Sequence, residues 1–225
     1  MYFLSIETAT DVCCVAIHDA QQVIDNMVYL EANMHGNILN QLIEDILFKN
    51  KINIKEISAI AIGEGPGSYT GMRIGMSVAK GLCYALDIPL IGISTLETMI
   101  RQVEKNIALL EKYELIIASV DARRDQVFAL AINNQIELFN KFIVLNDYDF
   151  SIFDNFTTIH LIGSGASKWH NYLHNKNIIL HTEVMNASAM HESLMKKWGI
   201  KNFVDLAYAE PNYMKEAYVN VGAIS

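Results

Sequence analysis

Cysteine is scarce in this chain, with 3 among 225 residues. Two of them, Cys13 and Cys14, are adjacent, so the set predicts neither a disulfide framework nor a zinc site. Long apolar runs are also missing, because no segment approaches the ~18 consecutive apolar residues of a membrane span. The first residues carry no Lys or Arg, and Glu7 interrupts the apolar stretch, which argues against a signal peptide. These features predict a cytoplasmic protein.

Positive charge is in short supply. The chain has 17 Lys and Arg against 25 Asp and Glu, a net charge of −8. Such a chain repels a polyphosphate backbone, so we do not expect it to bind nucleic acid tightly on its own. Because the basic residues occur only in small groups, we expect them to lie on solvent-exposed faces. The groups are Lys49, Lys51 and Lys55; Arg123 and Arg124; and Lys196, Lys197 and Lys201.

Apolar residues, by contrast, make up 52% of the chain, which is ample for a core. The length is about 1.5 times that of a typical domain, which fits two small lobes. Three consecutive predicted strands open each half of the sequence. They cover residues 2–6, 12–18 and 23–29, and again 115–120, 126–132 and 136–144. This reuse predicts two related lobes, 1–108 and 109–225.

The remaining pattern alternates helices with short strands. In the first half it predicts helices over 38–47, 69–86 and from 95 to about 110, with strands over 58–62 and 90–93. Ser68 is a candidate helix cap, and Ser94 with Glu97 forms a capping-box pattern. In the second half we expect a strand over 159–162 and a helix over 166–173.

The predicted helix over 69–86 is apolar on about three quarters of its surface. One flank, with Ile74, Val78 and Leu82, can face the chain's own sheet. The other flank would then need a second cover, from a partner or from helices of the same chain. It carries a small-residue ridge, which lets a neighbour approach closely, and two adaptable methionines. Its members are Gly71, Gly75, Ala79, Met72 and Met76.

The glycine-rich segment 63–71 lies between a predicted strand and a predicted helix. Exposed N–H groups at such a place can hold an anion, but glycines also permit a tight turn and close packing. The segment lacks the Lys-Ser/Thr ending of a P-loop. A tight turn is therefore the favoured interpretation.

In several segments the chain resembles the bacterial TsaB family, also called YeaZ, of tRNA threonylcarbamoyladenosine biosynthesis proteins. The matching segments are IETAT at 6–10, GEGPGSYTGMRIG at 63–75, STL at 94–96, VDAR at 120–123 and AEPNY at 209–213. The resemblance implies an α/β fold of the actin-like, Hsp70-like and sugar-kinase-like (ASKHA) class. In that class two lobes, each a mixed β-sheet with flanking helices, face each other across a cleft.

The resemblance also implies where a nucleotide would bind. Two turns, one in each lobe, and a later glycine pair hold the nucleotide in this class. Here they correspond to Glu7, Thr8 and Thr10, to Asp121 and Arg123, and to Gly163 and Gly165.

Neither of these turns contains the glycine that lets backbone N–H groups reach phosphates, since Ala9 and Ala122 stand there. Glu7 and Asp121 can hold hydrated magnesium, and Arg123 or Arg124 can contact phosphate. The alternatives are a capping carboxylate and a solvated arginine pair. We expect weak or absent ATP hydrolysis and no tightly bound cofactor. ATP or ADP with magnesium at a shared interface remains open.

Catalytic motifs are not evident. The related TsaD family has two histidines at a four-residue spacing, but here His35 is followed at that spacing by Leu39. His170 and His174 have the spacing, yet we interpret them as surface residues. Ser68 lies outside the Gly-x-Ser-x-Gly pattern of a nucleophile elbow. The sequence predicts no metal site, no catalytic residue and no protease activity.

The function implied by the resemblance is that of a non-catalytic partner. It would form a heterodimer with TsaD, with the ATPase TsaE as a third member, and would meet tRNA through the complex. The product is the threonylcarbamoyl group on adenosine 37 of tRNAs that read codons beginning with A. Alternatives are a small ATPase or phosphotransferase acting in its own cleft, and a homodimer when alone. The first lobe's helices would make the partner interface, through Ile38, Leu39, Leu42, Tyr69, Met72, Gly75, Met76 and Ala79.

Overall fold

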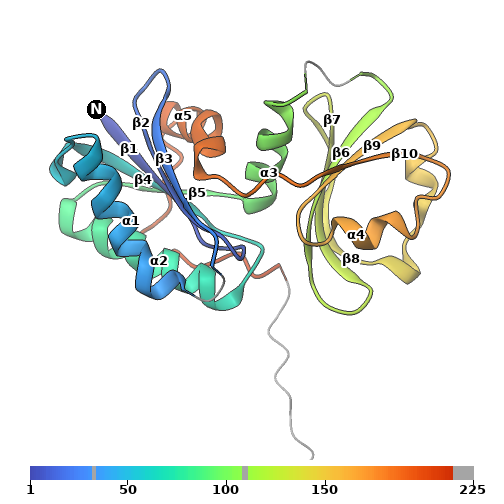
Figure 1. Ribbon diagram of the computed structural model, residues 1–225, viewed down its shortest axis with the longest axis horizontal. Coiled ribbons are helices and arrows are strands. Elements are labelled where there is room, and N and C mark those ends of the chain that lie inside the picture. The colour runs from blue at the N-terminus through green and yellow to red at the C-terminus, as the bar shows by residue number, and fades with distance from the viewer. Residues whose placement is uncertain (32–33, 108–110, 215–225) are drawn as a thin grey trace, which may run out of the picture.

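The computed structural model describes residues 1–31, 34–107 and 111–214 and shows two lobes, each built on a five-stranded sheet (Figure 1). In the first sheet the strand order is β3-β2-β1-β4-β5. The first three strands form an antiparallel meander, whereas β4 and β5 continue from β1 in parallel. The strands are β1 (Tyr2–Glu7), β2 (Cys13–His18), β3 (Val23–Tyr29), β4 (Ile57–Gly63) and β5 (Leu90–Ile93).

Two helices cover one face of the first sheet, α1 (His35–Lys49) and α2 (Tyr69–Leu86). The apolar stripe of α1, including Leu39 and Ile46, packs on Leu4 and Ile6 of β1. Successive side chains of a strand point to opposite faces, so Phe3 meets the other face. There it contacts α5 (His191–Gly199), with the Phe3 and Trp198 rings 5.1 Å apart.

The second sheet has the order β10-β9-β6-β7-β8, again an antiparallel meander extended by parallel strands. An aromatic cluster around Trp169 of α4 (Ala166–His170) fills its outer face. The strands are β6 (Glu114–Asp121), β7 (Gln126–Asn133), β8 (Ile136–Val144), β9 (Thr158–Ile162) and β10 (Asn177–His181). Short 3₁₀ turns cover Ile54–Glu56, Leu145–Asp147, Phe150–Phe153 and Ala187–Met190.

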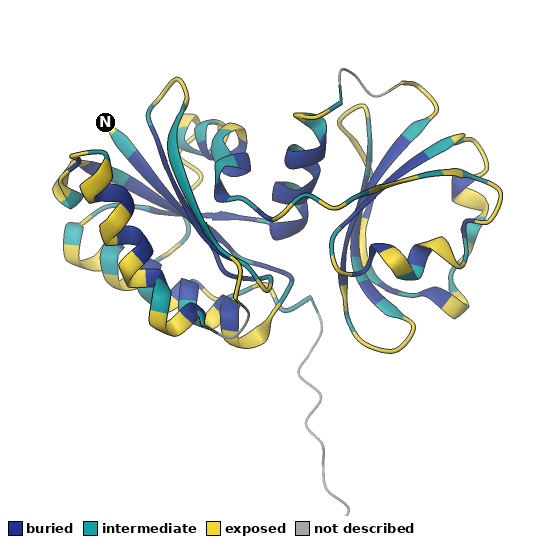
Figure 2. Cartoon of the chain, in the orientation of Figure 1, coloured by how far each residue is buried: buried dark blue, intermediate teal, exposed yellow. Residues whose placement is uncertain are grey.

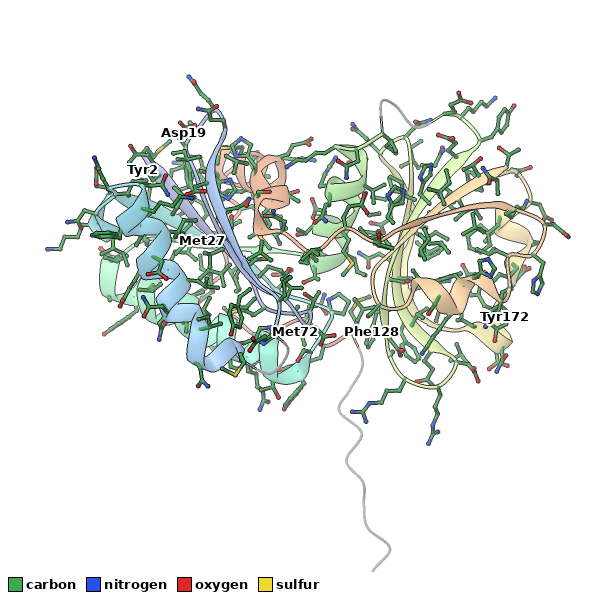
Figure 3. All side chains as sticks on the ribbon, in the orientation of Figure 1. Tyr2, Asp19, Met27, Met72, Phe128 and Tyr172 are labelled. Atoms are coloured by element: carbon green, nitrogen blue, oxygen red, sulfur yellow. The ribbon has the colours of Figure 1, made fainter. Side chains whose placement is uncertain are left out.

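The helix α3 (Thr95–Glu104) lies between the two sheets, and most of it is buried (Figure 2). Its apolar side chains Leu96 and Ile100 belong to one cluster with Ala16 of the first sheet and Ala118 of the second. Phe128 of β7 packs against this cluster, on the side of the second lobe that faces the first (Figure 3). The lobes are therefore joined by a shared core as well as by the chain.

Both predicted meanders, the helix over 69–86 and the strand over 90–93 are confirmed within one or two residues. The Ser94 side chain accepts from the Glu97 N–H, but the Glu97 carboxylate binds Ser193, so only half of the capping box forms. The helix ends at Glu104, short of the expected end near residue 110, which lies outside the described residues. The predicted lobe boundary at 108/109 also lies outside them.

The expected second lobe, 109–225, needs correction at its C-terminal end. After β10 the chain returns to the first lobe, where Met190 and Leu194 pack on Phe3 and Ile91. The Val204 N–H then donates to the Leu90 oxygen at 2.9 Å. β10 and α5 were not predicted, and the helix expected over 166–173 ends at His170. In the described residues no helix is long and apolar enough to cross a membrane.

Candidate functional site

A cleft of about 830 Å³ opens between the lobes. The first lobe contributes the turn after β1, the start of α2 and two residues of α3. The second contributes the turn between β6 and β7, the β9–α4 connection and the chain after β10. The lining includes Ala9, Thr10, Asp11, Val12, Gly67, Ser68, Tyr69, Thr70, Met99, Gln102, Asp121, Arg123, Gly163, Ser164, His181 and Glu183.

The residues predicted to bind a nucleotide are only partly brought together. Thr10, Asp121, Arg123 and Gly163 line the cleft. Three others are buried behind its wall, namely Glu7, Thr8 and Gly165. For Gly165 the reason is a close approach to β6, since its N–H donates to the Ser119 oxygen at 3.0 Å.

The carboxyl group of Glu7 points into the protein. Oε1 accepts the Ala9 N–H at 2.7 Å, and Oε2 accepts the Thr95 hydroxyl at 2.9 Å. Burial raises the pKa of Glu7 to about 7, although hydrogen bonds from Ala9 and Thr95 oppose the rise. With both oxygens engaged away from the cleft, Glu7 does not fit the predicted role of a magnesium ligand. It holds the β1 turn against the start of α3 instead.

The glycine-rich segment lies directly against that turn. A Cβ on Gly67 would overlap the backbone oxygen of Ala9, and one on Gly71 would overlap that of Thr8. The Ser68 N–H donates to the Ala9 oxygen at 2.6 Å, and the Ser68 hydroxyl accepts the Gly71 N–H at 3.2 Å. Close packing needs these glycines, which confirms the tight turn and the Ser68 cap.

The corresponding turn of the second lobe is held by a lysine. Lys168 of α4 donates to Asp121 Oδ1 at 2.5 Å and to the backbone oxygen of Arg124 at 2.6 Å. The Arg123 N–H donates to the same Asp121 oxygen at 2.6 Å. Partial burial would raise the pKa of Asp121, but the hydrogen bonds from Lys168 and Arg123 hold it below its usual value. An Asp121 already paired with an ammonium group is poorly placed to bind magnesium.

The charge of the cleft also disfavours a polyphosphate. Its described lining carries the carboxylates of Asp11, Asp121 and Glu183 against the guanidinium of Arg123. Lys168 already compensates the charge of Asp121, which leaves two negative groups, Asp11 and Glu183, against one positive group, and this balance repels an unaccompanied triphosphate.

The histidines and other potential metal ligands do not form a site within the described residues 1–31, 34–107 and 111–214. No group of three or more His, Cys, Asp or Glu side chains there is arranged to hold a metal ion. His35 Nε2 lies 3.0 Å from the Thr10 oxygen. His170 and His174 do not share a helix, because α4 ends at the first of them, and both are exposed.

The predicted partner interface requires a correction, because six of its eight residues are buried inside this chain. The small-residue ridge of α2 faces the chain's own sheet, where a Cβ on Gly75 would overlap the Thr8 hydroxyl. The flank with Ile74 and Val78 is the partly exposed one, so the two flanks are the reverse of the prediction. Ile38 and Tyr69 remain accessible, whereas the buried residues are Leu39, Leu42, Met72, Gly75, Met76 and Ala79.

A groove follows this exposed flank between the starts of α1 and α2. At its end Arg73 lies 4.0 Å from the centre of the Tyr69 ring and donates through Nε to the Tyr213 hydroxyl at 3.0 Å. Sequence reasoning missed this cluster, although Tyr213 stands in the quoted AEPNY segment. It also missed Lys168 and Gln102, for which no sequence signal exists. The groove residues are Gly36, Tyr69, Thr70, Arg73, Ile74, Ser77 and Val78.

Comparison with known proteins agrees with this description. The family model "TsaD: tRNA N6-adenosine threonylcarbamoyltransferase" matches residues 29–149. The tRNA threonylcarbamoyladenosine biosynthesis protein TsaB of Escherichia coli (strain K12) is 36% identical over 129 residues, which are 57% of this chain and 53% of that protein. The match thus spans about half the length of the curated relative.

Solved structures match over nearly the whole chain. YeaZ from Pseudomonas aeruginosa has a TM-score of 0.76 at 21% identity, covering 94% of this chain and 100% of that one. The activator of the 2-hydroxyisocaproyl-CoA dehydratase from Clostridium difficile with bound ADPNP has a TM-score of 0.51 at 11% identity, covering 91% and 99%. These likenesses confirm the predicted two-lobed ASKHA fold.

The family model covers just over half of the chain, and the TsaB relative aligns over a similar share. The chain therefore belongs to the TsaD family and, within it, is a relative of the TsaB proteins.

Proposed function

We propose that this chain is a non-catalytic subunit in tRNA threonylcarbamoyladenosine biosynthesis and that it acts by pairing with TsaD. The relative from Escherichia coli is named as a biosynthesis protein, and the matching family model describes a transferase. The modification would be the threonylcarbamoyl group on adenosine 37 of tRNAs reading codons that begin with A.

The observation that carries this proposal is that the two acidic residues expected at a nucleotide site, Glu7 and Asp121, bind groups of their own chain. Glu7 binds Ala9 and Thr95, and Asp121 binds Lys168, so each carboxylate is engaged by its own chain. A phosphoryl-transfer site needs such groups free for metal and phosphate. The chemistry would therefore reside in TsaD. ATP or ADP with magnesium, if used, would be held at the interface that the two proteins share.

The accessible flank of α2 and the neighbouring part of α1 are the proposed contact with TsaD. Ile74 and Val78 present apolar surface there, next to Tyr69 and Ile38, while the buried glycine ridge fixes α2 against the sheet. The same face would serve a homodimer when TsaD is absent. TsaE would join as a third member. tRNA would be met through the complex, in keeping with the net charge of −8.

The test is the mass of the chain in solution, by light scattering, with and without TsaD of the same source. We expect a one-to-one complex with the unchanged chain and its loss with Ile74→Arg. The control is Ile136→Arg, since Ile136 is 68% exposed on the second lobe. If Ile74→Arg associates as well as the control, the interface is elsewhere. If the unchanged chain stays alone, the pairing itself is wrong.

A second candidate is a small ATPase or phosphotransferase acting in its own cleft. The cleft volume of about 830 Å³ is large enough for a nucleotide, and the dehydratase activator of the same fold was solved with ADPNP. This candidate requires phosphate release by the pure chain with ATP and magnesium, and its loss in Asp121→Asn. We expect release no faster than in the blank.

A further inference from the structure

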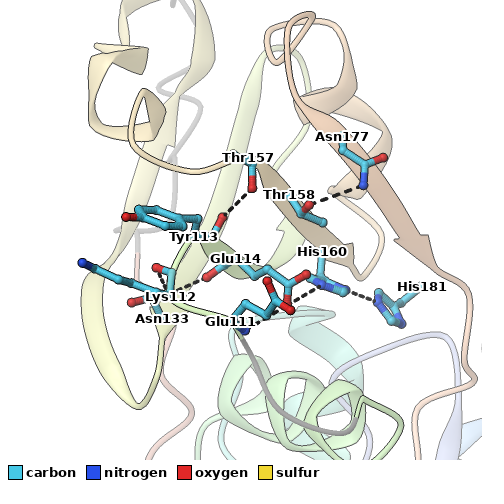
Figure 4. Close-up of polar contacts among 10 residues, drawn as sticks. All are labelled: Glu111, Lys112, Tyr113, Glu114, Asn133, Thr157, Thr158, His160, Asn177 and His181. Carbon is cyan, nitrogen blue, oxygen red and sulfur yellow. Dashed lines mark hydrogen bonds and ion pairs between the residues drawn. The ribbon is translucent and has the colours of Figure 1, made fainter.

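Two histidines of the second lobe lie side by side on neighbouring strands, His160 on β9 and His181 at the end of β10 (Figure 4). The Nδ1 atom of His160 is 2.9 Å from Nε2 of His181. On the outer side, His181 Nδ1 lies 3.2 Å from Glu183 Oε1. On the inner side, His160 Nε2 lies 4.0 Å from Glu114 Oε2. The four side chains form one row, with a carboxylate at each end and the two imidazole rings between them.

The positions of the hydrogens in this row of side chains follow from the donor and acceptor roles of its members. A carboxylate only accepts, so His181 Nδ1 carries a hydrogen toward Glu183. In the neutral ring His181 Nε2 is then bare and accepts, so His160 Nδ1 carries the hydrogen between the rings. His160 Nε2 is left as a bare acceptor facing the Glu114 carboxylate. Two acceptors at 4.0 Å cannot bond, and this nitrogen finds no hydrogen-bond partner among the described residues.

One added proton resolves this conflict. With His181 protonated on both nitrogens, its Nε2–H donates to His160 Nδ1, and His160 Nε2 then carries a hydrogen toward Glu114. A second proton would put two positive rings in contact, which is strongly disfavoured. The pair is thus built to hold one extra proton. The added proton comes from solvent and binds His160 Nε2, while the Nδ1 proton of His160 passes to His181 Nε2. One N–H bond thus breaks and two form, and the solvent hydronium gives up one O–H bond.

Burial disfavours a positive charge on His160. His160 is only 4% exposed, and burial followed by the nearby His181 lowers its pKa, with Glu114 opposing. Glu114 of β6 is oriented by the Glu111 N–H, which donates to Oε2 at 3.0 Å. From the turn after α3 the facing group is the neutral amide of Asn106, which donates to Glu183 Oε1 at 3.0 Å.

The outer carboxylate, Glu183, lies on the segment that leads from β10 back toward the first lobe. Residues 182–186, the crossing segment, carry the chain from β10 back toward the first lobe, and residues 182–185 line the cleft. Gln102 of α3 grips it twice, donating to the Val184 oxygen at 2.7 Å and accepting the Asn186 N–H at 3.2 Å. Glu183 adds a third attachment, because one of its oxygens accepts from both His181 and Asn106.

We propose that the His160–His181 pair is a one-proton switch that fastens the crossing segment more firmly to the second lobe and to the turn after α3 as the pH falls below neutrality. Protonation adds a positive charge on His181 to the carboxylate already present on Glu183, so the hydrogen bond between them becomes an ion pair and is strengthened. Because Glu183 also binds Asn106, the wall of the cleft is stiffened from both sides.

The first measurement uses the full chain with ¹⁵N-labelled histidine, followed by NMR from pH 8 to pH 5. We expect both rings to be Nδ1–H tautomers at pH 8 and to share one midpoint on acidification. After correction for intrinsic rates, hydrogen exchange at the Asn186 amide should slow by about fivefold across that midpoint. Two independent midpoints, or a His160 that carries its hydrogen on Nε2 at pH 8, would overturn the proposal.

Variants separate the switch from a general effect of acid. Glu183→Gln removes the outer carboxylate, so the shared midpoint should fall by about one pH unit and the change at Asn186 should vanish. His174→Gln removes an exposed ring of the same lobe and should leave both readouts as in the unchanged chain. A pH effect on Asn186 that survives in Glu183→Gln would rule out the switch.

Discussion

The Thr8 hydroxyl donates to the backbone oxygen of Gly71 at 2.8 Å, across 63 residues of sequence. Through this bond the turn after β1 and the first turn of α2 form one unit. Thr8 is fully buried, and Gly71 and Gly75 pass directly over it. Phosphate has no room between these elements, so the glycine-rich segment serves here for close packing.

Two glycines of α2 should respond oppositely to the same change. Gly71→Ala puts a methyl group onto the backbone oxygen of Thr8 and should destabilise the fold by about 1 to 3 kcal/mol. A Cβ on Gly81 meets nothing within 4 Å, so Gly81→Ala should stabilise it by about 0.5 to 1 kcal/mol. Urea unfolding of both variants measures the difference. Equal effects would show that α2 does not pack on the β1 turn as described.

Glu7 should make stability depend on pH. Its pKa rises from 4.5 to about 7 on folding, so the folded chain binds the extra proton between these values. The Glu7 contribution is therefore most favourable below pH 4.5, falls as the pH rises to 7, and then stays constant, a loss of up to about 3 kcal/mol. Glu7→Gln removes this loss. Between pH 5 and pH 8 its urea-unfolding free energy should fall less than that of the unchanged chain.

A suitable control for that comparison is Glu137→Gln, because Glu137 is exposed on β8. It should keep the pH dependence of the unchanged chain. If Glu7→Gln keeps it too, the buried carboxyl is not responsible.

Lys168→Met should loosen the turn between β6 and β7. Lys168 donates to Asp121, to the Arg124 oxygen and to the Gln126 oxygen, and its side chain is 21% exposed. Loss of these bonds should cost about 1 to 2 kcal/mol in urea unfolding. The pKa of Asp121 should rise at the same time, which carboxyl-detected NMR can follow. An unchanged Asp121 titration would mean that Lys168 does not hold it.

Gln102→Ala should release the crossing segment without unfolding either lobe. The Asn186 amide loses its acceptor, so its hydrogen exchange should quicken by tenfold or more, about 1.4 kcal/mol. Amides of the strand pair β1 and β2 serve as an internal reference and should be unaffected. Quicker exchange in that reference as well would indicate general destabilisation rather than local release.

Much of the fold is predictable from the sequence because its periodic patterns are strong. β3, β5 and α2 begin and end where the pattern predicts. The orientation of α2 is not predictable in this way, since both of its flanks are apolar. Composition does not predict that Gly75 packs against Thr8 of the turn after β1 while Ile74 lies near the surface.

The site was predictable only where residues follow strand ends. Thr10, Asp121 and Gly163 reach the cleft for that reason. The inward turn of Glu7 depends on Thr95, 88 residues away, and no local pattern reports such a contact. α5 escaped prediction because its nine residues carry few apolar groups, and its partners Phe3 and Ile91 lie far away in sequence.

The return of α5 to the first sheet has a consequence for synthesis. As the chain leaves the ribosome, β1 to β5 emerge with one face of their sheet uncovered, because Leu194, which packs on Phe3 and Ile91, has not yet been synthesised. The second lobe must be translated in full before that cover is made. The first lobe is therefore synthesised before the second but completed after it. A nascent chain halted near residue 107 would expose the uncovered apolar face of the first sheet to chaperones.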